Sequence, residues 1–297
     1  LLALIQRWPL STRNSLFERA VYQADRLHAF AAESDSLAVV TSSEELKQVL
    51  KSREDGSELI AGLLGTEGSH ALDGDLDNIK RLYDAGFRMM SLQHFFDNKL
   101  GGSLHGESNA GLTEFGREAV RQMDSMGIMI DVSHSSPQVV DDVLNLIDSP
   151  LIVSHTGFKG HCDRKRNISD DLMMRIAERG GLIGVGFWSE AVCGTDVTAI
   201  ADAIAYGVET FGVEAVALGS DWDGAVTTPL AANDLAYLNE EEMGSFTTVC
   251  PGIRVKAESG GQKRTSTIRD AINIGADYLV VAREIISSSD PHKVINE

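Results

Sequence analysis

The chain has 297 residues, of which 43% are hydrophobic, and its formal net charge is −18. This length is sufficient for one large α/β domain, and the acidic surface argues against binding of nucleic acid or of an anionic membrane. No apolar run approaches the roughly 20 residues that are needed to span a bilayer, so no membrane partner is expected.

The first part of the chain alternates between helices and apolar strands. Apolar residues recur at helical spacing over 12–34, with Asn14 or Ser15 as candidate N-caps, and a second helix begins near Ser42. The run that follows, 59–67, is apolar throughout and ends in Glu67, which is typical of a buried strand ending in a carboxylate. The next expected elements alternate in the same way: a helix at 76–85, a strand at 87–94, a helix at 113–126, a strand at 129–134, a helix at 137–147 and a strand at 151–155.

The alternation continues with a helix at 169–179, a strand at 181–187, a helix at 199–211 and a strand at 213–221. Six strands are therefore predicted before residue 222. Five of them end in a side chain with acid, base or ligand chemistry, namely Glu67, His94, His134, His155 and Asp221. Repeated βα units predict a parallel sheet, and the gathering of such residues on one rim favours a (βα)8 TIM-type barrel over an open sheet.

A carboxylate together with two histidines is a ligand set that suits zinc. An additional aspartate near the metal suits a general base for water activation. The alternative is that some of the five side chains serve only as helix caps or loop hydrogen-bond partners.

Four motifs in this order resemble the membrane (renal-type) dipeptidases, which are binuclear zinc peptidases on a (βα)8 barrel. The motifs are Gly65-Thr66-Glu67-Gly68, Asp131-Val132-Ser133-His134, Val153-Ser154-His155 and Gly219-Ser220-Asp221-Trp222-Asp223-Gly224. The resemblance covers roughly residues 1 to 232, and the joint occurrence of the motifs is highly specific.

The resemblance implies a role for each matching residue. Glu67 corresponds to the carboxylate that bridges two metals, and His134 and His155 correspond to the ligands of the second metal. By the same resemblance, His94 binds the substrate and stabilises the tetrahedral intermediate, Arg166 holds the substrate carboxylate, and Asp221 is the catalytic acid and base.

The chain departs from this family pattern near its beginning. The family's first strand ends in His-x-Asp and supplies the remaining ligands of the first metal, and no His-x-Asp occurs at such a strand end here. By this interpretation the barrel lacks its first two strands. One zinc site is then expected to be intact and the second to be incomplete, with impaired dipeptidase activity.

The last part of the chain resembles a different (βα)8 enzyme, orotidine 5′-monophosphate decarboxylase. A strand at 246–254, a helix at 267–274 and a strand at 276–283 carry this resemblance, which implies that Gln262 and Arg283 bind phosphate. The decarboxylase's Asp-x-Lys-x-x-Asp cluster is missing, so that activity is not expected. Six dipeptidase-like units (1–232) and two decarboxylase-like units (233–297) would form a single barrel, which predicts a chimera.

Two functions follow from these patterns. The first is a zinc-dependent dipeptidase that acts on a dipeptide-like small molecule. The second is an engineered barrel scaffold without native activity that binds a phosphate-type anion near Gln262 and Arg283.

The cysteines and the remaining histidines give weaker indications. Cys162, Cys193 and Cys250 are widely spaced, which favours a reducing, cytoplasmic location over a dense disulfide framework. His161 and Cys162 are a minor alternative as metal ligands, and His105, in a glycine-rich loop, is expected to line the mouth of the site.

Overall fold

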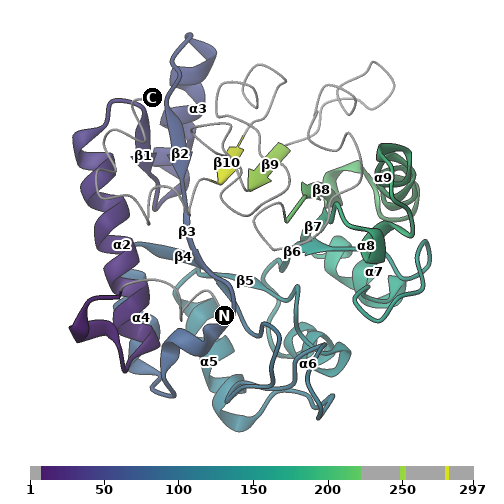
Figure 1. The fold of residues 1–297 in the computed structure, drawn as a ribbon. Helices are drawn as coiled ribbons and strands as arrows, with labels where there is room; N and C mark the ends of the chain where they lie inside the picture. Colours follow the sequence, from purple (N-terminus) through teal and green to yellow (C-terminus); the bar gives the residue numbers. More distant parts are fainter. Residues whose placement is uncertain (1–7, 222–247, 252–277, 281–297) are drawn as a thin grey trace.

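The computed structural model describes residues 8–221, 248–251 and 278–280, and its centre is a parallel sheet (Figure 1). The sheet has eight strands in the order β10-β9-β8-β7-β6-β5-β4-β3, so each strand lies beside its neighbour in the sequence. This order is the one that repeated βα units dictate. The strands are β3 (Leu64–Thr66), β4 (Phe87–Ser91), β5 (Met129–Asp131), β6 (Ile152–Thr156), β7 (Leu182–Val185), β8 (Val216–Gly219), β9 (Thr248–Pro251) and β10 (Tyr278–Val280).

A second, two-stranded parallel sheet consists of β1 (Leu37–Val39) and β2 (Ile60–Gly62). The analysis of the sequence did not predict β1. The predicted strand at 59–67 is present as two pieces, β2 and β3, which are separated by the exposed Leu63.

Strand β10 lies beside β2 at the far end of the large sheet (Figure 1). The strand ladders of the described residues do not join β10 to β2, and therefore they do not form a closed barrel. The parallel α/β sheet is confirmed, and closure of the barrel stays a prediction.

The two strands expected in the last part of the chain are represented, among the described residues, by β9 and β10. Strand β9 pairs in parallel with β8, and β10 pairs in parallel with β9. They continue the sheet that the earlier six strands begin. The predicted helix at 267–274 lies outside the described residues.

The helices lie on the outside of the arc of strands (Figure 1). They are α2 (Leu16–Glu33), α3 (Ser43–Glu54), α4 (Asp77–Asp84), α5 (Glu114–Ser125), α6 (Pro137–Leu146), α7 (Asp170–Glu178), α8 (Ser189–Val192) and α9 (Val197–Phe211). Three short 3-10 helices, η1 (Leu10–Thr12), η2 (Ser69–Leu72) and η3 (Val213–Ala215), complete the described elements. In the described part of the chain, none of the helices has the length and apolar character that crossing a membrane requires.

Side-chain caps fix where several helices begin. Ser15 Oγ accepts a hydrogen bond from the Glu18 amide at 3.0 Å, and Thr113 Oγ1 accepts one from the Gly116 amide at 3.0 Å. Ser15 is thereby confirmed as the predicted cap, and both hydroxyls satisfy an amide that the first helical turn leaves without a partner.

The hydrophobic core lies between the helices and the sheet. Strand residues such as Met90, Val153 and Ile183 are fully buried, and helix residues such as Ile79 and Ile176 pack in the same cluster. Each such side chain contributes about 1.5–3 kcal/mol through burial. This packing fixes the strands, and with them the side chains at their C-terminal ends.

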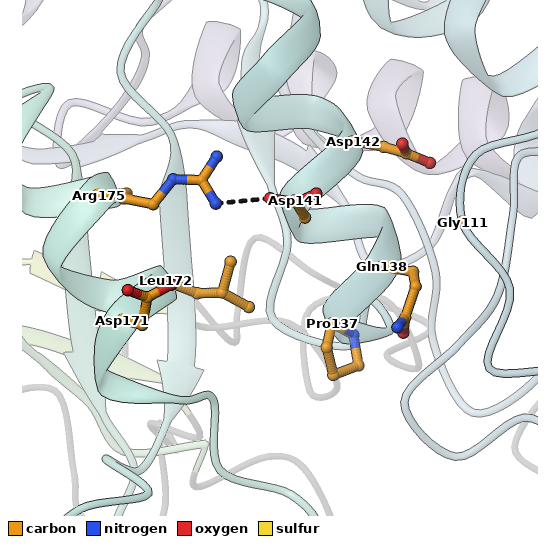
Figure 2. Close-up of a pocket in the computed structure, with 8 residues that line it drawn as sticks. All are labelled: Gly111, Pro137, Gln138, Asp141, Asp142, Asp171, Leu172 and Arg175. Carbon is orange, nitrogen blue, oxygen red and sulfur yellow. Dashed lines mark hydrogen bonds and ion pairs between the residues drawn. The ribbon is translucent and has the colours of Figure 1, made fainter.

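A cavity of about 360 Å³ opens between α6 and α7 (Figure 2). Asp141 and Arg175 form an ion pair of 2.5 Å across it. Its lining residues are Gly111, Pro137, Gln138, Asp141, Asp142, Asp171, Leu172 and Arg175, and none of the predicted site residues is among them.

Candidate metal centre

Four of the predicted site residues follow or belong to neighbouring strands of the sheet. Glu67 comes directly after β3, His94 follows β4, His134 follows β5, and His155 is part of β6. Because the strands are parallel and adjacent, their carboxyl ends meet at one edge, as the sequence predicted.

Gly68 allows the turn after Glu67. Its φ is +83°, a conformation that side chains rarely adopt, and a Cβ there would lie 2.8 Å from His70 Cδ2 and 3.1 Å from His94 Cβ. A larger residue would therefore displace His94 from its place beside Glu67.

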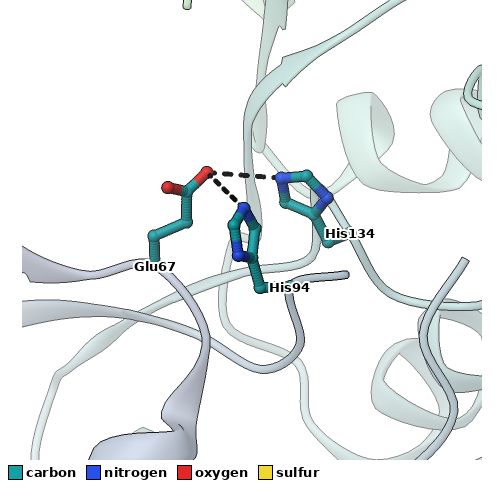
Figure 3. A group of neighbouring side chains, drawn as sticks. All are labelled: Glu67, His94 and His134. Carbon is teal, nitrogen blue, oxygen red and sulfur yellow. Dashed lines mark hydrogen bonds and ion pairs between the residues drawn. The ribbon is translucent and has the colours of Figure 1, made fainter. Parts of the chain in front are cut away.

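Figure 3 shows that His94 and His134 each direct a ring nitrogen at the same carboxylate oxygen of Glu67. Glu67 Oε1 lies 3.3 Å from Nε2 of His134, 3.5 Å from Nε2 of His155 and 3.6 Å from Nε2 of His94. The Nε2 atoms of His134 and His155 are 2.9 Å apart. Ligands bound tetrahedrally to zinc at about 2.0–2.1 Å lie roughly 3.3 Å from one another. The residues present therefore fit a divalent cation of this kind.

The electrostatics favour a cation. Burial raises the pKa of Glu67, but the hydrogen bond with His134 and the positive charge that each of the three imidazoles carries when protonated lower it, with a net decrease from 4.5 to about 2. Burial lowers the pKa of His94, and it lowers the pKa of His155 well below its usual value. The carboxylate is thus ionised and these imidazoles are neutral at pH 7, which are the protonation states that bind a metal.

A buried hydrogen-bond network orients His155 from behind. Asp131 Oδ1 accepts bonds from the Ser133 hydroxyl at 2.5 Å and from the Ser154 amide at 3.1 Å. Asp131 Oδ2 accepts a bond from the Ser154 hydroxyl at 2.8 Å, and that hydroxyl lies 2.9 Å from Nδ1 of His155. The network fixes the imidazole plane, as partners behind metal-binding histidines commonly do.

Arg166 is buried directly behind the two strands that carry His134 and His155. It donates hydrogen bonds to the carbonyl oxygens of Ser133 and His155, both at 2.8 Å, and to Thr156 Oγ1 at 3.2 Å. Burial lowers the pKa of Arg166 from 12.5 to about 10, although the negative charges of Asp221, Asp131 and Glu67 act to raise it. Arg166 therefore stays cationic at pH 7.

Asp221 follows β8, the sixth of the predicted strands. Its backbone has a φ of +53°, and its side chain is half-buried. Because β8 is parallel to β7 and β6, Asp221 comes at the same carboxyl edge of the sheet as the histidines, and its charge acts to raise the pKa of Arg166.

Two aromatic rings form a rim beside the cluster. The Phe95 ring centroid lies 4.3 Å from that of His94 and 5.8 Å from that of His134, and it lies 5.4 Å from that of His105. Burial is the main cause that lowers the pKa of His105 to about 4. The expected position of His105 at the mouth of the site is consistent with these contacts. Phe95 was not singled out in the sequence, although an aromatic residue directly after a strand-end histidine was an available signal.

The loop that carries Arg166 is tied to the segment around α8. Cys162 and Cys193 form a disulfide, and the Asn167 side-chain amide donates to the carbonyl oxygens of Cys162 and Ala191 at 2.8 and 3.0 Å. The disulfide corrects two expectations. The cysteines are not all reduced, and Cys162 is not available as a metal ligand beside His161, because its sulfur is bonded to Cys193.

A glutamate and histidines thus meet at the carboxyl edge of a parallel α/β sheet, which is a donor set suited to a divalent metal ion. The chain belongs to the membrane dipeptidase family (peptidase family M19), whose sequence model matches residues 6–240. This match confirms the resemblance predicted over roughly 1 to 232, and the metallopeptidases of this family depend on zinc. A second model, that of the orotidine 5′-phosphate decarboxylase / HUMPS family, matches residues 207–297.

Curated relatives agree with the family. The chain is 32% identical over 186 residues to an uncharacterized dipeptidase of Schizosaccharomyces pombe, which covers 60% of this chain and 45% of the relative. It is 29% identical over 226 residues to human dipeptidase 3, with 73% of this chain and 45% of the relative covered. The chain thus spans about half the length of these relatives.

Solved structures share the fold. An amidohydrolase from Pseudomonas aeruginosa matches with a TM-score of 0.63 at 23% identity, over 72% of this chain and 73% of that one. A metallopeptidase from Rhodobacter sphaeroides, solved with a phosphinate mimic of the dipeptide L-Ala-D-Ala, matches with a TM-score of 0.56 at 24% identity, over 65% of this chain and 57% of that one.

The predicted phosphate-binding residues Gln262 and Arg283 lie outside the described residues. None of these comparisons supports the hypothesis of an engineered scaffold without activity.

Proposed function

We propose that this chain is a metal-dependent hydrolase of dipeptides. The observation that carries the proposal is the convergence of three histidine nitrogens on Glu67 Oε1 at 3.3–3.6 Å, in a chain of the membrane dipeptidase family. Glu67, His134 and His155 would hold zinc. When bound, zinc supplies a Lewis acid that activates water and polarises a peptide carbonyl.

Arg166 is the proposed partner of the substrate's carboxylate. An arginine carries five N–H donors in a planar fork. Three hydrogen bonds to Ser133, His155 and Thr156 fix the guanidinium from behind. The remaining donors are then oriented in advance, and this reduces the ordering that substrate binding requires.

Asp221 is the proposed proton carrier of the reaction. It would accept a proton from the attacking water and deliver it to the amine that leaves when the peptide bond breaks. A carboxylate suits this role because it can act as base in one step and as acid in the next. The charge of Asp221 acts to raise the pKa of Arg166, which helps to keep the guanidinium cationic.

A dipeptide is the proposed substrate because ring surfaces border the polar cluster at this edge of the sheet. Phe95 and His105 present ring surfaces beside the histidine cluster, and half of the Phe95 surface is exposed. The dipeptide mimic bound by the Rhodobacter sphaeroides relative supports this substrate class.

The experiment that tests the proposal is hydrolysis of L-Ala-D-Ala by the zinc-loaded chain and by the Glu67→Gln variant. The expected result is turnover that a chelator abolishes and that falls at least 100-fold in Glu67→Gln. The control variant is Glu209→Gln, at an exposed carboxylate on α9, which should retain turnover. Turnover that Glu67→Gln retains would contradict the proposal.

We also propose that the chain joins two segments of different ancestry, 1–232 and 233–297. The second sequence-model match, over residues 207–297, supports this proposal. A phosphate site at Gln262 and Arg283 would then be inherited from the second segment. Titration with inorganic phosphate tests it, and affinity should be lost in Arg283→Ala; equal affinity in that variant would exclude the site.

A further inference from the structure

Two phenylalanines follow His94 on the segment after β4, and both expose their rings. Phe95 is 50% exposed and Phe96 is 73% exposed. Burial of such a side chain would stabilise the fold, so the two rings leave favourable contacts unused. Adjacent exposed apolar side chains at the edge of a polar cluster indicate a surface that a ligand covers.

Of these two rings, Phe95 is the one that lies against the histidines. Its ring centroid is 4.3 Å from that of His94, 5.4 Å from that of His105 and 5.8 Å from that of His134. The Phe96 ring makes no such contact with a ring in the described part of the chain. The exposed half of Phe95 therefore borders the polar cluster, whereas Phe96 has the same chemistry beside it in the sequence without this placement.

The proposed anchor of the substrate carboxylate belongs to other strands. Arg166 donates hydrogen bonds to the carbonyl oxygens of Ser133, after β5, and of His155, on β6. Its guanidinium carbon lies 5.4 Å from the ring centroid of Trp188, which comes after β7. Phe95 follows β4, on the other side of β5 in the sheet. A substrate whose C-terminal carboxylate is held at Arg166 would therefore extend toward β4 with its N-terminal residue.

The two ends of the site are close enough for a short peptide. Burial is the main cause that lowers the pKa of His94 and of His105, and the charge of Arg166 adds to it in both cases. Both of these histidines contact the Phe95 ring, so the arginine acts electrostatically on the rim that Phe95 belongs to. Two residues of extended chain span about 7 Å, which suits a dipeptide placed between these two groups.

We propose that Phe95 contacts the side chain of the substrate's N-terminal residue, and that the preferred substrates are dipeptides with a large apolar residue at that position. This inference rests on the proposed hydrolysis of dipeptides. Contact with the phenyl ring removes apolar surface of both partners from water, which favours leucine or phenylalanine over glycine. A polar side chain would lose hydration at this ring without gaining a hydrogen bond from it.

The test compares kcat/KM for Leu-Ala and Gly-Ala in the zinc-loaded wild type, Phe95→Ala and Phe96→Ala. We expect the wild type to prefer Leu-Ala by about 10-fold or more, the discrimination that apolar contacts provide. Phe95→Ala should reduce this preference to about 3-fold or less, and Phe96→Ala, the matched control, should retain it. An equal loss for both substrates in Phe95→Ala would overturn the proposal and leave Phe95 as a support of His94.

Binding without turnover gives an independent measurement. Calorimetry with phosphinate mimics of Leu-Ala and Gly-Ala should show that Phe95→Ala weakens the first about 10-fold and the second about 2-fold or less. Equal weakening of both mimics would overturn the role of Phe95. Hydrolysis by the wild type without preference for Leu-Ala would overturn that role alone, whereas a wild type that hydrolyses no dipeptide would overturn the proposed function as well.

Discussion

The hydroxyl of Ser154 lies 2.9 Å from Nδ1 of His155. The same hydroxyl is 2.8 Å from Oδ2 of Asp131, a carboxylate that can only accept when it is ionised. The single hydroxyl proton of Ser154 therefore goes to Asp131, and Ser154 accepts the proton of His155 Nδ1. This arrangement leaves the lone pair of His155 on Nε2, the atom that lies 3.5 Å from Glu67 Oε1 and that would bind a metal.

Replacement of this hydroxyl should weaken metal binding. We expect Ser154→Ala to reduce zinc affinity about 10–100-fold, the usual effect of removing a partner behind a metal-binding histidine. Chelator competition measures the change. Ser125→Ala, at an exposed position on α5, is the control and should bind zinc as the wild type does. An unchanged affinity in Ser154→Ala would show that the network does not orient His155.

The disulfide between Cys162 and Cys193 should stabilise the fold. It closes a loop with a sequence separation of 31 residues, for which the loss of unfolded-state entropy predicts about 3–4 kcal/mol. We expect Cys193→Ser to lower the free energy of unfolding by this amount in denaturant titrations. Thiol titration of the unfolded, unreduced wild type should find one free thiol, from Cys250, and three thiols per chain would contradict the pairing.

The carboxylate of Asp97 organises the loop that carries His105. It accepts hydrogen bonds from the amides of Ser103 at 2.8 Å, Ser108 at 3.0 Å and Glu107 at 3.1 Å. The backbone hydrogen bonds from Ser103 and Ser108 lower the pKa of Asp97 below its usual 3.8. A lowered pKa in the folded state means that ionised Asp97 stabilises the fold above about pH 4, and that this contribution is lost as the pH falls through the folded pKa.

Asp97→Asn should therefore destabilise the protein at pH 7. The expected loss is limited to about 1 kcal/mol, because Asp97 is exposed and solvent screens its hydrogen bonds. The difference from wild type should shrink as the pH falls below 4. Denaturant titrations at several pH values measure it, with Asp35→Asn as an exposed control. A difference that grows on acidification would contradict this account.

Arg166 should be sensitive to replacement by lysine. A lysine retains the charge but cannot donate simultaneously to the carbonyl oxygens of Ser133 and His155 in the planar geometry of a guanidinium. We expect Arg166→Lys to raise KM for a dipeptide at least 10-fold and to affect kcat less. A substrate without a free carboxylate should show a smaller change in KM, and an equal change would exclude carboxylate binding.

Local signals in the sequence predicted most of the helices and strands. Ser15 and Thr113 were identifiable as caps because a hydroxyl at a helix start has one favourable partner, an amide in the first turn. Strand β1 was missed because three residues between two helices show no periodicity. Whether β10 and β2 join depends on contacts between segments far apart in the chain, which no local pattern encodes.

The site was predictable where topology alone determines it. Parallel neighbouring strands necessarily bring Glu67, His134 and His155 to one edge. The approach of His94 to the same oxygen was not predictable, since it depends on the bend after β4. The pairing of Cys162 with Cys193 likewise depends on how the Arg166 loop folds against α8.

Metal content is the most direct test of the account as a whole. Elemental analysis of the dialysed wild type and of Glu67→Gln should find close to one zinc per chain in the wild type and much less in the variant. Two zinc ions per wild-type chain would contradict the expectation that the second zinc site is incomplete. No zinc in the wild type, or equal zinc in Glu67→Gln, would contradict a metal centre at Glu67.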